Sequence, residues 1–99
     1  MADAPKPAYW IAHVTVLDEA AYGEYARRAG PAIAAHGGEF LARGGAHVQL
    51  EGRDHARNVL ARFPSLDTAE ACYRSAAYQE ALRFAVGASE RDLVIVEGA

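Results

Sequence analysis

The longest strand-like pattern in the chain runs from Ala8 to Val16, where β-branched and aromatic residues follow one another without a turn signal. Alternate positions divide this run into two faces: one carries Trp10, Ala12, Val14 and Val16, and the other carries Tyr9, Ile11, His13 and Thr15. Neither face is properly polar, so we expect the strand to be covered on both sides. The run Leu93–Val96 is apolar at every position and predicts a last strand of the same kind.

A long helix is predicted between these strands. Asp18 is a suitable N-cap, and apolar residues then recur every three to four positions as far as His36. Gly30-Pro31 predicts a kink or break, because proline lacks the amide proton and clashes with the preceding turn. Gly37-Gly38 follows and is expected to end the helix, since glycine tolerates the left-handed cap conformation.

The remaining elements are shorter. Extended runs are expected at Glu39–Arg43, His47–Glu51 and Asn58–Phe63, with a polar, solvated loop around Asp54-His55. A second helical region begins within Pro64–Asp67, where a serine or an aspartate can cap it, and continues past a break near Ser75 to Val86. The order strand, helix, strand, strand, helix, strand is that of a ferredoxin-like βαββαβ sandwich of the α+β class, with helices on one side of an antiparallel sheet.

The other face of such a sheet has no helices to cover it. Because two of the predicted strands are apolar on both faces, something else must bury that surface. For a short chain the economical solution is a second copy of itself, related by two-fold symmetry. We therefore expect a homodimer that packs through its sheet faces.

Composition narrows the class of protein. The chain has 99 residues, which is enough for one domain, and residues 1–7, with two prolines, are expected to form a flexible tail. Ten basic residues against thirteen acidic ones give a net charge of −3 without a basic block, so neither a nucleic acid nor a membrane is an expected partner. The single Cys72 fits a reducing, cytoplasmic location and is expected to be a buried structural cysteine.

Eight short segments carry a resemblance to a known family. They are Tyr9–Ala12, Val14–Val16, Tyr22–Tyr25, Gly37–Gly45, Glu51–Gly52, Phe63–Ser65, Ser75–Gln79 and Glu97–Gly98. In this order and spacing they resemble the DUF1330 family, a set of small bacterial proteins of unknown function, and residues 8–99 are identified as a single DUF1330-like domain. The resemblance implies the dimeric α+β barrel superfamily, whose members include cofactor-free monooxygenases, lactone isomerases, heme enzymes and proteins with no known activity.

Three positions depart from the family's usual pattern. Arg62 stands where a glutamate is usual, Cys72 where an aromatic residue is common, and Ala85 where an arginine is frequent, with Arg83 two residues earlier. If these positions line a cavity in relatives, the cavity of this chain differs in charge and volume. The identity of a ligand is therefore not carried over from the family.

Three residues are candidates for catalysis. His13 lies within a strand predicted to be buried on both faces, where an imidazole can act as a general base; the alternative is a core or interface histidine satisfied by one hydrogen bond. Arg43 ends an extended run, and its guanidinium can bind a carboxylate or enolate through two hydrogen bonds. Glu51 is the third candidate, and the alternative is that Arg43 and Glu51 pair across a hairpin.

Three further residues are candidates for ligand binding. Tyr22 and Tyr78 can present hydroxyl groups from the helices toward the sheet, as can Tyr25, and the alternative is a core tyrosine with a polar end. Arg62 is a candidate ligand clamp, and the alternative is an ion pair with Glu51 or Glu97. No metal is expected, because the four histidines lack metal-ligand spacing and no CxxC motif occurs, and no cofactor is expected either.

The function that these residues favour is binding of a small organic molecule in a pocket between sheet and helices. Cofactor-free proton transfer or oxygenation is the matching reaction, with His13 taking a proton and Arg43 stabilising the resulting anion. Two alternatives stay open. One is a non-catalytic stress or interaction protein whose role is dimer-mediated assembly, and the other is a subunit of a larger enzyme.

Overall fold

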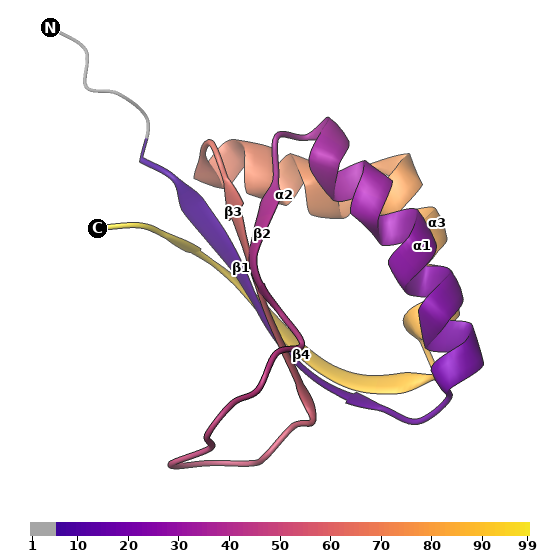
Figure 1. The fold of residues 1–99 in the computed structure, drawn as a ribbon. Coiled ribbons are helices and arrows are strands. Elements are labelled where there is room, and N and C mark those ends of the chain that lie inside the picture. The colour runs from indigo at the N-terminus through magenta and orange to yellow at the C-terminus, as the bar shows by residue number, and fades with distance from the viewer. Residues whose placement is uncertain (1–5) are drawn as a thin grey trace, which may run out of the picture.

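The computed structural model describes residues 6–99, and Figure 1 shows their path. In chain order the elements are β1 (Ala8–Val16), α1 (Glu19–Ala35), β2 (Glu39–Arg43), β3 (Arg57–Phe63), α2 (Leu66–Arg74), α3 (Ala76–Ala85) and β4 (Ser89–Glu97). The predicted α+β, ferredoxin-like order is confirmed, with the second helical region divided into two helices. Of the tail expected over residues 1–7, residues 1–5 lie outside the described part, and the Pro7 carbonyl accepts a hydrogen bond from the Gly98 amide at 2.8 Å.

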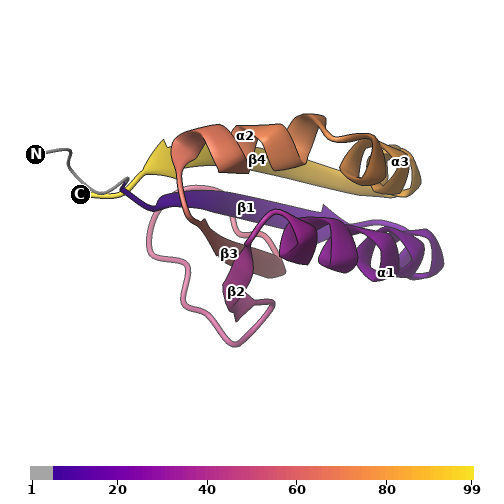
Figure 2. The same cartoon turned by 90° about the horizontal axis from the view of Figure 1, so that it is seen from above.

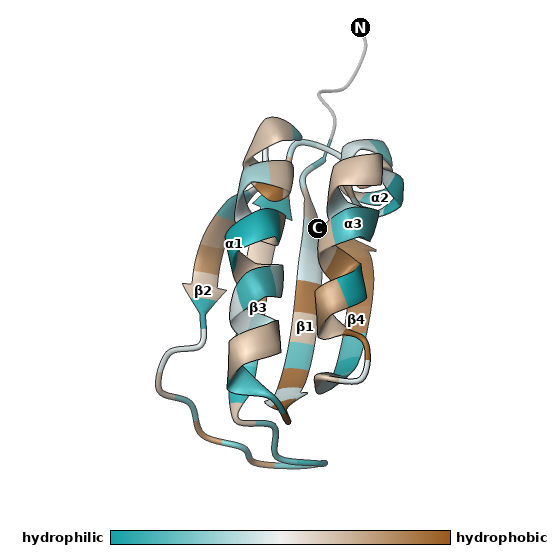
Figure 3. Ribbon diagram, turned by 90° about the vertical axis from the view of Figure 1, so that its right-hand side faces the viewer, coloured by the Kyte–Doolittle hydropathy of each residue, from teal (hydrophilic) through white to brown (hydrophobic). Residues whose placement is uncertain are grey.

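The four strands form one antiparallel sheet in the order β2-β3-β1-β4. β1 and β3 are therefore the inner strands. All three helices lie on one face of this sheet (Figure 1). α1 covers the half that holds β2 and β3, whereas α2 and α3 lie over the half that holds β4 (Figures 2 and 3). None of the helices in residues 6–99 is long and apolar enough to cross a membrane.

The core lies between the sheet and the helices and is centred on Trp10. The Trp10 ring packs 5.0 Å from both the Phe63 and the Tyr78 rings, measured between centroids. Its indole Nε1 donates a hydrogen bond of 3.0 Å to the Ala69 carbonyl, which joins β1 to α2. Cys72 is completely buried in the same core, as expected, and burial raises the pKa of its thiol to about 11. The thiol therefore stays protonated and unreactive near neutral pH.

The helix boundaries follow the predicted caps. Asp18 accepts a hydrogen bond from the Ala21 amide at 3.1 Å, and serines cap both α2 and α3. The break expected at Gly30-Pro31 is wrong, because α1 continues through Pro31 to Ala35. The proline ring points to solvent, where it meets no neighbouring element, and the packing of α1 on the rest of the fold outweighs the lost backbone hydrogen bond.

The extended run expected at His47–Glu51 is also wrong. Residues 44–56 form a loop between β2 and β3 that projects beyond the sheet (Figure 1). One contact lies within the loop, where His47 Nε2 is 3.1 Å from Asp54 Oδ1. Another connects the loop to the sheet, where Arg53 forms an ion pair with Glu90 of β4. Nor is the end of the loop fully solvated, because His55 is buried and its Nδ1 lies 2.9 Å from the hydroxyl oxygen of Thr15.

The helix-free face of the sheet is apolar at one end and polar at the other. The register places five apolar side chains next to one another on this face, namely Tyr9, Ile11, Leu60, Val94 and Val96. In the single chain Val94 and Val96 are exposed. By contrast, Figure 3 shows hydrophilic residues along the outer sides of α1 and α3. Water reaches the apolar end of the sheet face unless another molecule covers it.

Gly38 tests the close packing between α1 and β3. A Cβ atom at Gly38 would lie 2.5 Å from Ile33 Cγ2, 2.8 Å from Phe63 Cε1 and 2.9 Å from the Ile33 carbonyl oxygen. We expect Gly38→Ala to lower the free energy of unfolding in urea by about 1–3 kcal/mol, because backbone as well as side chain must move. Gly45→Ala is the matched control, since a Cβ there meets nothing within 4 Å, and its effect should stay within about 0.5 kcal/mol. Equal effects of the two substitutions would contradict this packing.

Candidate functional site

A largely enclosed cavity lies between the sheet and α1. Its empty space is about 480 Å³, part of which is open to solvent, and we call this cavity the slot. Its walls are formed by Trp10, Ala12, Tyr22, Tyr25, Ala26, Ala29, Ile33, Phe40, Arg43, Arg57, Val59, Ala61, Arg91 and Leu93.

The slot exists because small side chains face each other across it. Ala12 and Ala61 lie on the sheet, and Ala26 and Ala29 lie on α1, so helix and sheet are held apart by the larger residues around them. Protein interiors are close-packed, and voids larger than a water molecule are few in a domain. A slot of this size beside charged side chains is therefore the best candidate for a binding site.

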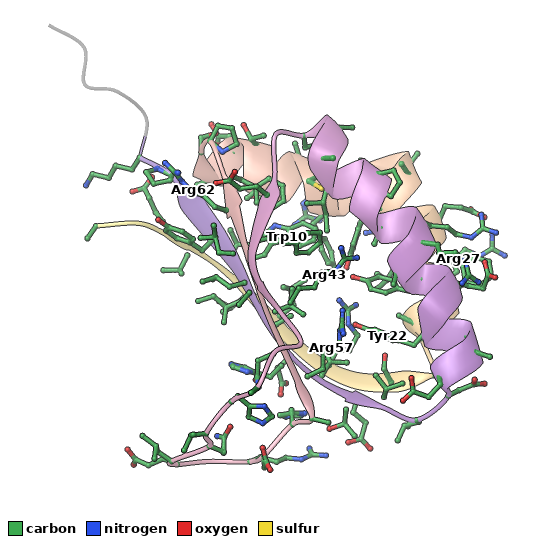
Figure 4. All side chains as sticks on the ribbon, in the orientation of Figure 1. Trp10, Tyr22, Arg27, Arg43, Arg57 and Arg62 are labelled. Carbon is green, nitrogen blue, oxygen red and sulfur yellow. The ribbon has the colours of Figure 1, made fainter. Side chains whose placement is uncertain are left out.

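Three arginines reach the slot from three different strands. Arg57 of β3 and Arg91 of β4 both pair with Val14 of β1, one on each side. Two antiparallel spacings place their Cα atoms about 10 Å apart on the same face of the sheet. Arg43 of β2 pairs with Val59 instead, two residues further along β3. Figure 4 shows Arg43 and Arg57 in the space between the sheet and α1, beside Tyr22.

These positive charges have no negative partner. Among residues 6–99, no carboxylate lies within ion-pair distance of Arg43, Arg57 or Arg91. The Nε atoms of Arg57 and Arg91 are buried and have no hydrogen-bond partner. Arginine cannot shed its charge at any ordinary pH, and two such charges that line one cavity repel each other. An anion between them would relieve both the repulsion and the missing hydrogen bonds.

Arg91 is held in place by two tyrosines. Its Nη2 donates hydrogen bonds to the Tyr25 hydroxyl at 2.9 Å and to the Tyr78 hydroxyl at 3.2 Å, and the two hydroxyl groups lie 2.8 Å apart. The Arg91 guanidinium carbon also lies 4.7 Å from the centre of the Tyr25 ring. Burial raises the pKa of Tyr25 above its ordinary value and outweighs the opposing effect of Arg91. The Tyr25 hydroxyl therefore stays protonated while it accepts from Arg91, and because one of the two tyrosines donates to the other, the pair keeps one proton to donate elsewhere.

The other two arginines are positioned by an aromatic ring and by a glycine. The exposed Arg43 lies with its guanidinium carbon 4.1 Å from the centre of the Phe40 ring, where Phe40 and Arg43 line the β2 side of the cavity. Gly44 follows with φ 71°, and a Cβ atom on it would lie only 2.6 Å from Arg57 Nη1. Glycine at this position thus provides both the left-handed backbone and the space that Arg57 occupies.

Three of the residues predicted from the sequence meet at this cavity. Arg43 and Tyr22 line it directly. Tyr78 is completely buried behind the wall and reaches the site through its hydrogen bonds to Tyr25 and Arg91. For these residues the structure brings together side chains that are far apart along the chain.

His13 lies elsewhere, on the opposite face of the sheet. It is exposed rather than buried, so the expectation of two-sided burial fails at this position in the single chain. Its Nδ1 lies 2.6 Å from the Asn58 side-chain oxygen, and its ring lies 6.2 Å from the ring of His55. Side chains alternate along β1, so His13 points away from the cavity that Ala12 and Trp10 line.

Glu51 and Arg62 also lie away from the cavity. Glu51 is exposed in the loop of residues 44–56. The strand next to β2 is β3, so the hairpin that was expected to pair Arg43 with Glu51 does not form. Arg62 is exposed, and its Nη1 lies 3.8 Å from a carboxylate oxygen of Glu39, which is neither of the two partners expected for it.

Arg57 and Arg91 were not anticipated from the sequence. Both lie one or two residues before the strand limits that the apolar runs suggested. The alternation of side chains along a strand contained the signal that was missed. Arg57 is an even number of residues from the inward-facing Ala61 and Phe63, and Arg91 is two residues from Leu93, so both arginines point to the helix-covered face. Among residues 6–99, no group of three or more His, Cys, Asp or Glu side chains is arranged to hold a metal ion.

Fold and cavity together define a ferredoxin-like α+β protein with an arginine-lined slot under its first helix. The chain belongs to the DUF1330 family, described as a domain of unknown function, whose family model matches residues 7–99. A comparison with curated proteins found no match.

Solved structures share the fold at low sequence identity. A Rhodopseudomonas palustris protein of unknown function, RPA0582, is 20% identical with a TM-score of 0.78, over 98% of this chain and 85% of that one. SnoaB from Streptomyces nogalater, described as a cofactor-independent oxygenase, is 12% identical with a TM-score of 0.69, over 95% and 94% of the two chains. A Bacteroides fragilis protein of unknown function, described as dimeric and ferredoxin-like, is 12% identical with a TM-score of 0.64, over 97% and 100%.

The tyrosine pair that holds Arg91 yields a test of the site's construction. We expect Tyr25→Phe and Tyr78→Phe each to lower the free energy of unfolding by about 1–3 kcal/mol, because each leaves a buried donor without its acceptor. The double variant should deviate from additivity by about 0.5 kcal/mol or more, as coupled residues do. Tyr9→Phe is the control, since no hydrogen bond of the Tyr9 hydroxyl is found among residues 6–99, and it should change stability by less than about 0.5 kcal/mol. Strict additivity in urea unfolding would refute the network.

Proposed function

We propose that this protein binds a small organic anion in the slot between the sheet and α1. The observation that carries the proposal is the group of three arginines, Arg43, Arg57 and Arg91, around one cavity without a carboxylate partner among residues 6–99. Arg57 and Arg91 are half-buried, and charges that are removed from water normally have partners. Since the described chain supplies none, a bound anion is the partner that fits.

The reaction expected from the sequence, cofactor-free proton transfer or oxygenation, belongs to the same proposal. Tyr25, which lines the cavity, does not replace His13 as the group that takes a proton, because burial keeps its hydroxyl protonated; its role in this proposal is to donate a hydrogen bond to the anion, whose proton is lost to water. The guanidinium groups would stabilise an enolate or phenolate oxygen. The likeness to SnoaB supports oxygenation only through the shared fold.

The assembly that we propose is a homodimer through the helix-free sheet face. The support is the exposed apolar end of that face, formed by Tyr9, Ile11, Leu60, Val94 and Val96. The Bacteroides fragilis relative, which shares the fold, is described as dimeric. The arginine cavity opens on the other side of the sheet and is lined by one chain alone, so the dimer would leave it accessible.

A charge placed on the sheet face tests the dimer. Val94→Lys should convert a dimer into a folded monomer, because the ammonium group would have to leave water on association. Val86→Lys is the matched control: Val86 is more exposed than Val94 but lies at the end of α3, away from the sheet face. Light scattering after size exclusion measures the mass of each variant. A monomeric wild-type protein, or a Val94→Lys variant that stays dimeric, would rule out this interface.

Native mass spectrometry of protein purified gently from its natural host tests the binding function. We expect the mass of the chain or its dimer plus a reproducible small adduct. Arg57→Gln should reduce adduct occupancy at least about tenfold, since a hydrogen-bonded charge pair is worth about 1.5–3 kcal/mol. Arg83→Gln, which changes an exposed arginine paired with Glu80, should keep the adduct. Its absence from the wild-type protein would favour the non-catalytic interaction protein instead.

A further inference from the structure

We propose that the anion is a small planar aromatic carboxylate, with its carboxylate between Arg57 and Arg91 and its ring over Ala12 in the direction of Trp10. This rests on the proposed function and names the chemical class of the ligand. The cavity is charged at one end and apolar at the other, and the register of the sheet fixes which end is which.

The charged end lies at the level of Val14. Arg57 and Arg91 flank this buried residue on the helix-facing side, and both of them line the cavity, although Val14 itself does not. The buried Nε atom of each arginine is without a partner. The Nε edge of a guanidinium offers parallel N–H groups that match the two oxygens of a carboxylate. A carboxylate in the cavity would accept from the free Nε edge of Arg57 and from the donors that Arg91 has left, since Arg91 Nη2 already donates to Tyr25 and Tyr78.

The inventory of polar groups at this end favours an anion over a neutral polar molecule. Arg57 and Arg91 are donors only. The Tyr25 hydroxyl accepts a hydrogen bond from Arg91 and forms a second one with the Tyr78 hydroxyl. Only one of the two hydroxyl protons lies between the tyrosines, so the other can be donated to a ligand. No carboxylate lines the cavity. A ligand whose polar group only accepts hydrogen bonds matches the arginines of this set, whereas an amide or an alcohol would bring donors for which only tyrosine hydroxyl groups are present as acceptors.

The apolar end determines the rest of the ligand. Ala12 lies two residues along β1 from Val14, which is a distance of about 7 Å along the strand. At this level Ala12 is flanked by Val59 and Leu93. The distance from Val14 to Ala12 is roughly the length of a benzene ring that carries a carboxylate. Ala26 and Ala29 line the cavity from α1, and most of the other lining residues apart from the arginines and tyrosines are apolar. An apolar ring matches these walls, and it would point toward Trp10.

Arg43 fits the same ligand in a different role. It is exposed, and its guanidinium rests on the Phe40 ring at the β2 side of the cavity. It lies at the level of the ring and not of the carboxylate, since it pairs with Val59. Its contribution is therefore attraction of the anion toward the opening, whereas Arg57 and Arg91 hold the bound carboxylate.

The chain contains its own reporter for this proposal. Trp10 is the only tryptophan, and it lines the cavity. Titration with benzoate, at constant ionic strength, should change the Trp10 fluorescence in a saturable way when excitation is at the red edge, where benzoate and tyrosine do not absorb. Benzamide is the uncharged molecule of the same shape, and acetate is the carboxylate without a ring. We expect benzoate to bind at least tenfold more tightly than either.

Arginine variants locate the bound carboxylate. Arg57→Gln should weaken benzoate binding at least tenfold, and the variant should fold, because Arg57 has no ion pair to lose among residues 6–99. Arg83→Gln is the control and should bind benzoate as the wild-type protein does. Equal weakening by both variants would contradict the position of the carboxylate.

The wild-type comparison decides the class of ligand even if a variant fails to fold. Benzamide binding as tightly as benzoate would overturn the carboxylate, and acetate binding as tightly would overturn the aromatic ring. A native adduct that depends on Arg57, in a protein that binds no benzoate, would refute this inference while the proposed function stands. Failure of the proposed function itself is recognised differently, by the absence of any adduct from the native protein.

Discussion

The hydrogen bonds from Arg91 to Tyr25 and Tyr78 connect α1 with α3 and β4, the last two elements of the chain. Arg91 begins the helix-facing side of β4, Tyr25 lies in the middle of α1, and Tyr78 lies in the first turn of α3. The arginine cannot lose its charge, so the fold must keep two hydroxyl oxygens beside it. The arginine and the two tyrosines therefore stand between α1 and the sheet at this end of the cavity. Next to them, alanines of both α1 and the sheet leave the space between helix and sheet open. The slot is thus a consequence of the hydrogen bonds by which Tyr25 and Tyr78 replace water around the half-buried Arg91.

Much of the fold followed from local signals in the sequence. The apolar run of β1, the Asp18 cap and the serine before α2 each acted within a few residues, and the structure contains all of them. The errors arose where tertiary contacts outweighed local preference. Pro31 remains inside a helix because its ring faces solvent, and His47–Glu51 forms a loop because no strand lies beside it to pair with.

The site was less predictable, because it depends on register. Arg43 and Tyr22 could be proposed from their positions near element ends, but Arg57 and Arg91 join them only through their shared pairing with Val14. That pairing cannot be derived from one strand at a time. His13 shows the reverse problem: its neighbours suggested burial, yet the sheet face on which it lies is uncovered in the single chain. Alternation gives the face of a residue, whereas the partner strands decide what that face meets.

The distribution of charge also limits the kind of anion that can reach the slot. The chain carries ten basic and thirteen acidic residues, and three of the basic ones line the cavity. The rest of the surface is therefore more negative than the net charge suggests. Within a screening length of about 8 Å of the surface at physiological salt, a polyanion would meet repulsion from these carboxylates. A small monoanion would meet less of it and could come within range of Arg43 at the β2 side. The charge distribution therefore favours a small anion over a polyanion as the ligand of the proposed site.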